Sequence, residues 1–269
     1  MKKNLTTFLI ILVVLTILGV GGFFIFKSKK PAEEEPVTPE SEGVLIKTTL
    51  EERPFVTLTP RTDGRELTLE ISRVKNAQTI EYELVYLSAG LSRGVIGSID
   101  LDGEAAVERK LLLGTCSRDV CKYDEDVTEG TLTLRFRGSD GVRKFIADFH
   151  LQQGDKILTS IDNNFQLEGT ISPTTFYLTM PTVGLPREIE GQPVSEIYGV
   201  FTAGSKTIKS GIVNLALIEE NPDVALYSWD GRAWQVEEED FKTDGKTLSA
   251  SVGQLAAFMA IATTKTPTE

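Results

Sequence analysis

The chain has 269 residues, 39 acidic against 28 basic side chains, and a formal net charge of −11. So acidic a chain lacks the basic stripes that DNA or RNA binding requires, and electrostatic docking on an anionic lipid surface is excluded for the same reason. Its length is sufficient for two folded domains.

An uncharged apolar run, Leu5–Phe26, is flanked by lysines on both sides. As a helix it would span about 33 Å, close to the roughly 30 Å hydrocarbon core of a bilayer. A signal peptide cleaved near Gly19-Val20-Gly21 is the alternative, but its apolar run would end earlier. We therefore predict a transmembrane signal anchor over residues 1–30.

The next segment, residues 31–42, reads PAEEEPVTPESE. Its prolines and glutamates leave little to bury, so we expect a disordered, acidic, Pro-rich stalk. The lysines on the two sides of the anchor nearly cancel as topology signals. Every acidic residue and both cysteines follow Lys30, and a disulfide-bearing body is typical of the outside of a cell. We expect a single-pass protein of the cytoplasmic membrane with extracytoplasmic C-terminal domains.

Alternation of apolar and polar residues predicts β-strands in the first half of the remaining chain. The alternating runs are Glu66–Ile71, Ile80–Leu84 and Thr131–Phe136, and one further strand places Phe145, Ala147, Phe149 and Leu151 on one face. Turn-forming pairs separate the runs: Asp63-Gly64, Asp102-Gly103 and Asp140-Gly141. Short strands with such turns are typical of antiparallel β-sandwiches.

Gln152-Gln153-Gly154-Asp155 interrupts the pattern, and we place a domain boundary there. Further strands are then predicted at Lys156–Ile161, Phe165–Glu168, Thr175–Met180, Ile197–Phe201, Ile212–Ile218, Val224–Trp229, Lys246–Val252 and Ala257–Ala262. The fold prediction is all-β, with two antiparallel immunoglobulin-like β-sandwich domains after one N-terminal transmembrane helix. The domains are residues 43–153 and 154–263, and residues 264–269 form a loose tail.

The run Ala225–Trp234, followed by Thr247–Val252 and the apolar Ala256–Ala262, resembles the closing strands of sandwich modules in bacterial surface proteins. With its anchor and stalk, the chain resembles uncharacterised bacterial membrane-anchored surface proteins with immunoglobulin-like β-sandwich domains. The resemblance implies a cell-surface setting and no defined reaction.

Cys116 and Cys121 are the only cysteines, with four residues between them. We predict a disulfide that pinches a hairpin or loop, worth roughly 2 kcal/mol in the chain-entropy model. A zinc site needs about four ligands, and two cysteines with one histidine are too few, so no metal site is predicted. A redox pair usually has the spacing Cys-x-x-Cys; it remains an alternative, as do two reduced structural thiols.

His150 is the only histidine and lies on the strand face opposite Phe149. We interpret it as a half-exposed strand residue, because no Gly-x-Ser-x-Gly elbow accompanies it. The acidic run Asp124-Glu125-Asp126 with Glu129 lacks the EF-hand spacing. A solvated loop is expected there, with an irregular calcium site as the alternative. We predict no catalytic residue and no cofactor.

Three aromatic residues, Tyr227, Trp229 and Trp234, flank the turn signal Asp230-Gly231. A two-residue turn would pair Tyr227 with Trp234, and a four-residue loop would pair Trp229 with Trp234. Either register puts all three aromatics on one face. We interpret that face as sandwich core, with a ligand platform for a sugar or peptide as the functional alternative.

These features predict a non-enzymatic surface protein that presents β-sandwich modules for adhesion, envelope organisation or partner binding. The expected partners are the membrane, through the N-terminal helix, and an unknown surface protein or glycan. One alternative is an accessory subunit of a membrane or pilus-like assembly. Another is a carboxylate-dependent enzyme acting on polysaccharide, which a deep acidic cleft would favour.

Overall fold

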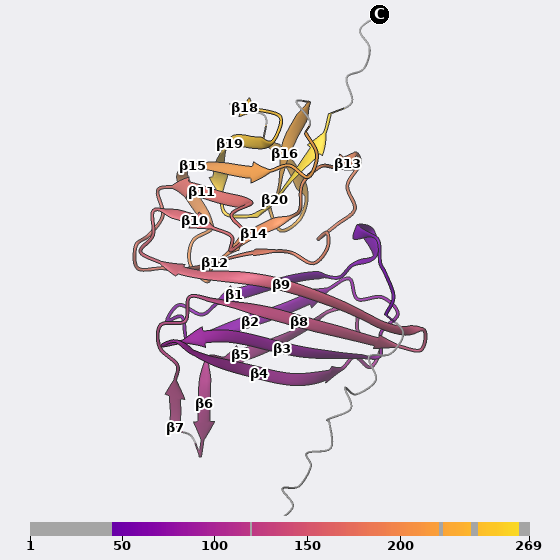
Figure 1. Cartoon of the computed structure of the whole chain (residues 1–269), viewed down its shortest axis with the longest axis vertical. Coiled ribbons are helices and arrows are strands. Elements are labelled where there is room, and N and C mark those ends of the chain that lie inside the picture. Colours follow the sequence, from indigo (N-terminus) through magenta and orange to yellow (C-terminus); the bar gives the residue numbers. More distant parts are fainter. Residues whose placement is uncertain (1–44, 119, 221–222, 238–241, 264–269) are drawn as a thin grey trace, which may run out of the picture. The chain divides into compact units, whose positions relative to one another are not determined.

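The computed structural model describes residues 45–118, 120–220, 223–237 and 242–263 (Figure 1). The predicted anchor, stalk and tail lie outside these residues. In the described part of the chain, regular structure consists of one 3₁₀ turn, η1 (Leu50–Glu52), and β-strands whose sheet partners are all antiparallel. The predicted all-β class is confirmed. No helix among these residues is long and apolar enough to cross a bilayer.

The first sheet has the strand order β1–β2–β5. Its strands are β1 (Phe55–Pro60), β2 (Glu66–Ser72) and β5 (Val107–Leu112). A separate hairpin follows it in the chain, made of β6 (Gly114–Ser117) and β7 (Val120–Tyr123). In Figure 1 this hairpin extends away from the sheets.

The longest sheet has the order β17–β16–β20–β14–β12–β9–β8–β3–β4, with β13 beside β20. Its strands in chain order are β3 (Thr79–Ser88), β4 (Leu91–Asp100), β8 (Glu129–Gly138), β9 (Gly141–Gln153), β12 (Phe176–Pro181), β13 (Gln192–Pro193), β14 (Tyr198–Phe201), β16 (Val224–Trp229), β17 (Trp234–Glu237) and β20 (Ala257–Ala262). We call it the long sheet.

The remaining sheet has the order β10–β11–β15–β19–β18. Its strands are β10 (Ile157–Thr159), β11 (Phe165–Gly169), β15 (Thr207–Ala216), β18 (Lys242–Thr243) and β19 (Thr247–Gln254). A bulge interrupts the pairing of β15 with β19 between Thr207 and Gly211. This sheet covers the later part of the long sheet.

The first core lies between sheet β1–β2–β5 and strands β3, β4, β8, β9 and β12 of the long sheet. Alternation in β2 turns Leu67, Leu69 and Ile71 into this core. The single face predicted for β9 is confirmed: Ala147, Phe149 and Leu151 are core members, and Phe145 packs against them. Two layers of apolar side chains therefore close a sandwich.

A second core lies on the opposite face of the long sheet. Residues that pair across antiparallel strands share a face, and neighbours along a strand alternate. In β12, Leu178 and Met180 belong to the first core, whereas Tyr177 belongs to the second. The second core continues through Tyr198 and Phe258, which pair with each other. The two smaller sheets thus cover opposite faces of one shared sheet.

The predicted domain boundary at residues 153 and 154 coincides with a strand end. Strand β9 stops at Gln153, and Gly154 follows with φ of +84°. The chain then returns as β12, which pairs with residues 150–153 of β9. Because the long sheet crosses the boundary, the described residues belong to one compact unit, and a division into two separate domains stays a prediction.

Candidate functional site

The predicted disulfide is present, and it lies in the β6–β7 hairpin. Cys116 and Cys121 face each other directly across the two strands. At the base of the hairpin, the Arg65 guanidinium lies 4.7 Å from the centroid of the Tyr123 ring. The disulfide therefore joins the two strands of the hairpin, and the Arg65–Tyr123 contact joins its base to the start of β2.

His150 and the acidic loop have structural partners. The half-buried His150 ring donates a hydrogen bond from Nδ1 to the Thr159 carbonyl oxygen at 2.9 Å. Asp124 accepts a hydrogen bond from the Tyr86 hydroxyl at 2.8 Å, and burial together with this bond raises the pKa of Tyr86. Among the described residues, no three potential ligands lie close enough to hold a metal ion.

The aromatic hairpin adopts the longer of the two predicted loops. Trp229 pairs with Trp234, so residues 230–233 form a four-residue loop. The two indole rings meet edge to face, with centroids 5.6 Å apart. The Asp230 carboxylate caps the loop, accepting hydrogen bonds from the backbone N–H groups of Arg232 and Ala233 at 2.7 and 2.8 Å.

The three aromatics pack against a third buried cluster, which lies on the face of the long sheet opposite the second core. Leu226 points into the second core instead. Tyr227, Trp229 and Trp234 are half-buried at the margin of a third cluster, formed by Leu185, Ile197, Ala257, Met259 and Ile261 on the other face of the long sheet. The Trp234 indole N–H donates to the Arg187 carbonyl oxygen at 3.0 Å.

Of the three aromatics, Trp229 alone lines a cleft of about 700 Å³, which we call the Trp229 cleft. One wall is the outer face of sheet β1–β2–β5. Register places Thr57, Glu70 and Glu108 in one row across its three strands. The opposite wall includes Lys206, Trp229 and Asp230. The cleft thus combines an indole with hydroxyl, carboxylate and ammonium groups.

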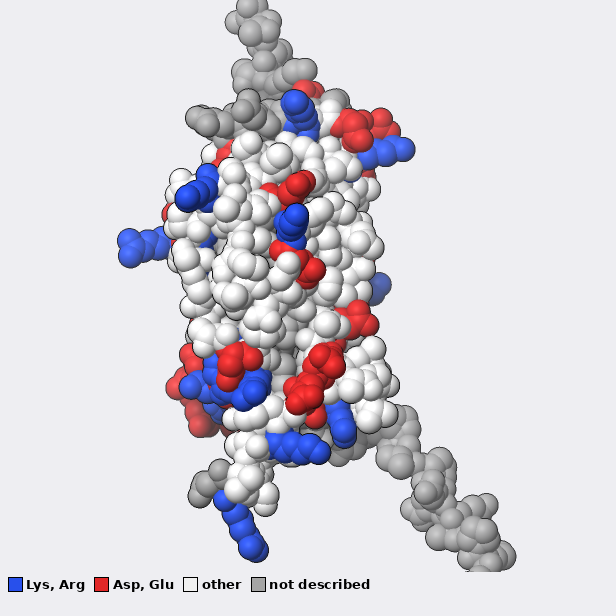
Figure 2. Space-filling model, turned by 90° about the vertical axis from the view of Figure 1, so that its left-hand side faces the viewer, with Lys and Arg blue, Asp and Glu red and all other residues white. Residues whose placement is uncertain are grey.

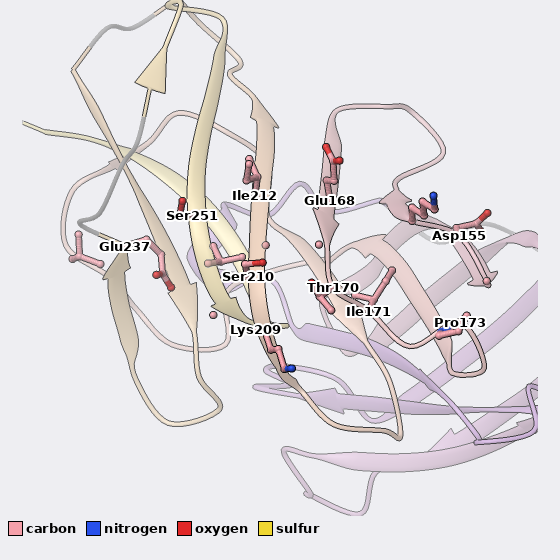
Figure 3. A pocket seen from close by; sticks show the side chains of 17 residues that line it. Asp155, Glu168, Thr170, Ile171, Pro173, Lys209, Ser210, Ile212, Glu237 and Ser251 are labelled. Atoms are coloured by element: carbon pink, nitrogen blue, oxygen red, sulfur yellow. The ribbon is translucent and has the colours of Figure 1, made fainter.

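A second, wider groove of about 1210 Å³ runs over the outer face of β11, β15 and β19 (Figure 3). Glu168, Ile212 and Ser251 form one row across the three strands, and Figure 3 shows them on neighbouring strands. The described residues that line this groove include no aromatic side chain. It offers hydrogen-bonding groups without a stacking surface, so the Trp229 cleft is the more distinctive site.

Charged side chains do not gather into a field of one sign on the face seen in Figure 2. Acidic and basic groups lie next to each other toward both ends, with a largely uncharged region between them. Oppositely charged neighbours cancel at a distance, so recognition on this face depends on short-range contacts.

Sequence reasoning identified Trp229 but missed the opposite wall of the cleft. Alternation in Glu66–Ile71 does place Glu70 on the outer face of its strand. Nothing in the sequence indicates that this face lies across from the Trp229 loop. No protein-family model matches the chain, and no curated protein is similar enough to count as a relative.

Proposed function

We propose that this is a membrane-anchored extracytoplasmic surface protein whose immunoglobulin-like sandwich body binds a glycan in the Trp229 cleft. The observation that carries the proposal is the convergence of one indole and a row of polar side chains in a cleft of about 700 Å³. Binding pockets of this size combine an apolar surface with a few polar groups that fix orientation.

The chemistry of the cleft suits a sugar ring. An indole covers the C–H face of a sugar, while hydroxyls and carboxylates exchange hydrogen bonds with its hydroxyl groups. Thr57, Thr59 and Ser72 supply hydroxyls, and Glu70 and Glu108 supply carboxylates. Thr57 donates to Glu70 at 3.3 Å, which links the row.

The surface location rests on the apolar run at the N-terminus and on the disulfide. The Cys116–Cys121 bond is suited to an oxidising compartment. The apolar run would act as the anchor, with the sandwich body beyond it.

One observation favours a second candidate, a carboxylate-dependent enzyme acting on polysaccharide. Glu70 and Glu108 face each other directly across β2 and β5. Like charges directly opposite destabilise a sheet, so such a pair suggests a role other than stability. Two carboxylates flanking a bound sugar are the groups that glycoside hydrolysis uses.

The proposal is tested by comparing Trp229→Ala with Trp234→Ala on a glycan array. Both changes remove one ring of the same aromatic pair, but only Trp229 lines the cleft. We expect Trp229→Ala to weaken retention of the bound glycan by about tenfold or more, since central aromatic contacts are typically worth roughly 2 kcal/mol. Trp234→Ala should retain binding.

Equal binding by the wild type and Trp229→Ala would contradict the proposal, and so would failure of the wild type to retain any glycan. Melting temperatures of both variants control for folding. Slow cleavage of the retained glycan that is lost in Glu70→Gln would instead favour the enzyme.

A further inference from the structure

The outer edge of β9 is open over much of its length. Strand β8 pairs with one edge of β9 from Gly141 to His150. On the other edge, β12 pairs only with residues 150–153, and Leu45 forms an isolated bridge with Val142. Between these two contacts, no strand of the described chain occupies the edge of β9.

The open edge carries hydrogen-bonding groups of known direction. The Val142 carbonyl accepts from the Ile46 N–H at 2.9 Å, so it points away from β8. Because backbone direction alternates along a strand, the N–H and C=O groups of Ile146 and Asp148 point the same way. These groups have no backbone partner among the described residues.

Pro181 explains why the pairing with β12 stops. Continuing the register from Thr179 and His150 would bring Pro181 opposite Asp148. Proline has no N–H to donate to the ladder. The chain turns instead toward β14, where the Thr182 N–H donates to the Ile197 carbonyl oxygen at 2.8 Å. The separation of the two strands leaves room beside β9.

A groove of about 1020 Å³ occupies this space, and we call it the β9 groove. Its lining includes Lys144–Ala147 of β9, and its other walls come from residues 45–48, 50, 51, 53, 181–183, 193, 195–197 and 218. Three of its apolar side chains are exposed: Leu45 at 54%, Ile146 at 60% and Ile218 at 66%. Exposed apolar groups beside open strand hydrogen bonds are the two features that strand addition uses.

The β9 groove contains charged side chains of both signs. Lys47 and Arg53 line it together with Glu51 and Glu196. The Nε atom of Arg53 is buried and has no hydrogen-bond partner among the described atoms. A carboxylate on a ligand would therefore complement Lys47 and Arg53.

We propose that the β9 groove binds an extended segment of a partner protein, which adds a strand to the long sheet beside Ile146 and Asp148. The segment alternates apolar and polar residues, so that its apolar side chains meet Ile146 and Ile218. It carries at least one carboxylate for the side of the groove formed by Lys47 and Arg53. This site is independent of the Trp229 cleft.

The test pans a phage-displayed library of random peptides against the full chain. Enriched peptides should alternate apolar residues and contain Asp or Glu. Hydrogen exchange should show that their binding protects the amides of Ile146 and Asp148, whereas Phe145 and Ala147 are already protected by β8.

Ile146→Pro removes the outward N–H without removing a hydrogen bond to β8 and should weaken binding about tenfold. Ile146→Ala, which keeps that N–H, should bind better than Ile146→Pro.

A charge reversal keeps the test decisive if the proline variant fails to fold. Lys47→Glu, at an exposed position, should weaken the acidic peptides several-fold, whereas the exposed Lys110→Glu on β5 should leave them unchanged. The proposal is overturned if panning enriches no peptide, if bound peptides leave the Ile146 and Asp148 amides unprotected, or if Lys47→Glu and Lys110→Glu have equal effects.

Discussion

Replacing Phe258 with alanine is expected to lower the free energy of unfolding by about 3–5 kcal/mol, the usual range for a buried phenylalanine. Phe258 is fully buried on β20, in the middle of the second core. Its ring stacks on Phe165 with centroids 5.8 Å apart. Strands β14 and β16 pair with β20 on both sides, so the surrounding structure can relax only partly into the cavity. Urea unfolding followed by circular dichroism measures the loss.

The matched control is Ile212→Ala on the outer face of β15, where the side chain is 48% exposed. It should change the free energy of unfolding by less than about 1 kcal/mol, since little surface is buried there. If Phe258→Ala lowered the free energy of unfolding no more than this control, the described packing of the second core around β20 would be contradicted.

Leu178→Ala is expected to cost about 2–5 kcal/mol and to weaken strands that precede it in the sequence. Leu178 lies after the predicted boundary, but it is fully buried in the first core. It pairs with Leu151 on β9 and Phe201 on β14. Hydrogen exchange should therefore show reduced protection of the amides in β8 and β9.

Val236→Ala provides the control for this experiment, since Val236 is 43% exposed on the edge strand β17. It should leave the amides of β8 and β9 protected as in the wild type. Unchanged protection of β8 and β9 in Leu178→Ala would show that the first core does not depend on β12.

Alternation predicted the strands that have one buried face. The predicted run Glu66–Ile71 lies in β2 (Glu66–Ser72), and the run Ile80–Leu84 lies in β3. Strand β4 was not predicted, because Gly94 and Gly97 interrupt the alternation of apolar and polar residues. The structure explains Gly97: the Tyr82 phenol ring occupies the space where a Cβ atom would lie. An aromatic ring on the neighbouring strand thus replaces the missing side chain.

We did not predict that one sheet takes part in both cores, although the sequence contains a signal for strands that are buried on both faces. Strands buried on both faces read as nearly continuous apolar runs. Residues 257–262 form such a run, and β12 has four consecutive buried residues, Tyr177–Met180. Alternation identifies the two faces of a strand, but it does not say which sheet covers each face. That depends on contacts far apart in the sequence.

The aromatic residues give a second example of a strand whose two faces can be identified from the sequence while the layer that covers each face cannot. The common face of Tyr227, Trp229 and Trp234 followed from spacing alone. Spacing does not show which face of the strand meets the second core, because Leu226 on one face and the aromatics on the other are all apolar. Tertiary packing decides it: Leu226 meets the second core, while the aromatics meet the cluster around Met259.

The central claim is that one shared sheet makes the two cores a single cooperative body. Equilibrium unfolding in urea, followed by two probes, tests it directly. Trp229 and Trp234 are the only tryptophans of the chain, and they pack against the cluster around Met259, so indole fluorescence reports the β16–β17 hairpin and this cluster, whereas far-ultraviolet circular dichroism reports all strands. The account predicts one transition with the same midpoint by both probes. A two-step dichroism curve, with fluorescence following only one of its steps, would contradict it.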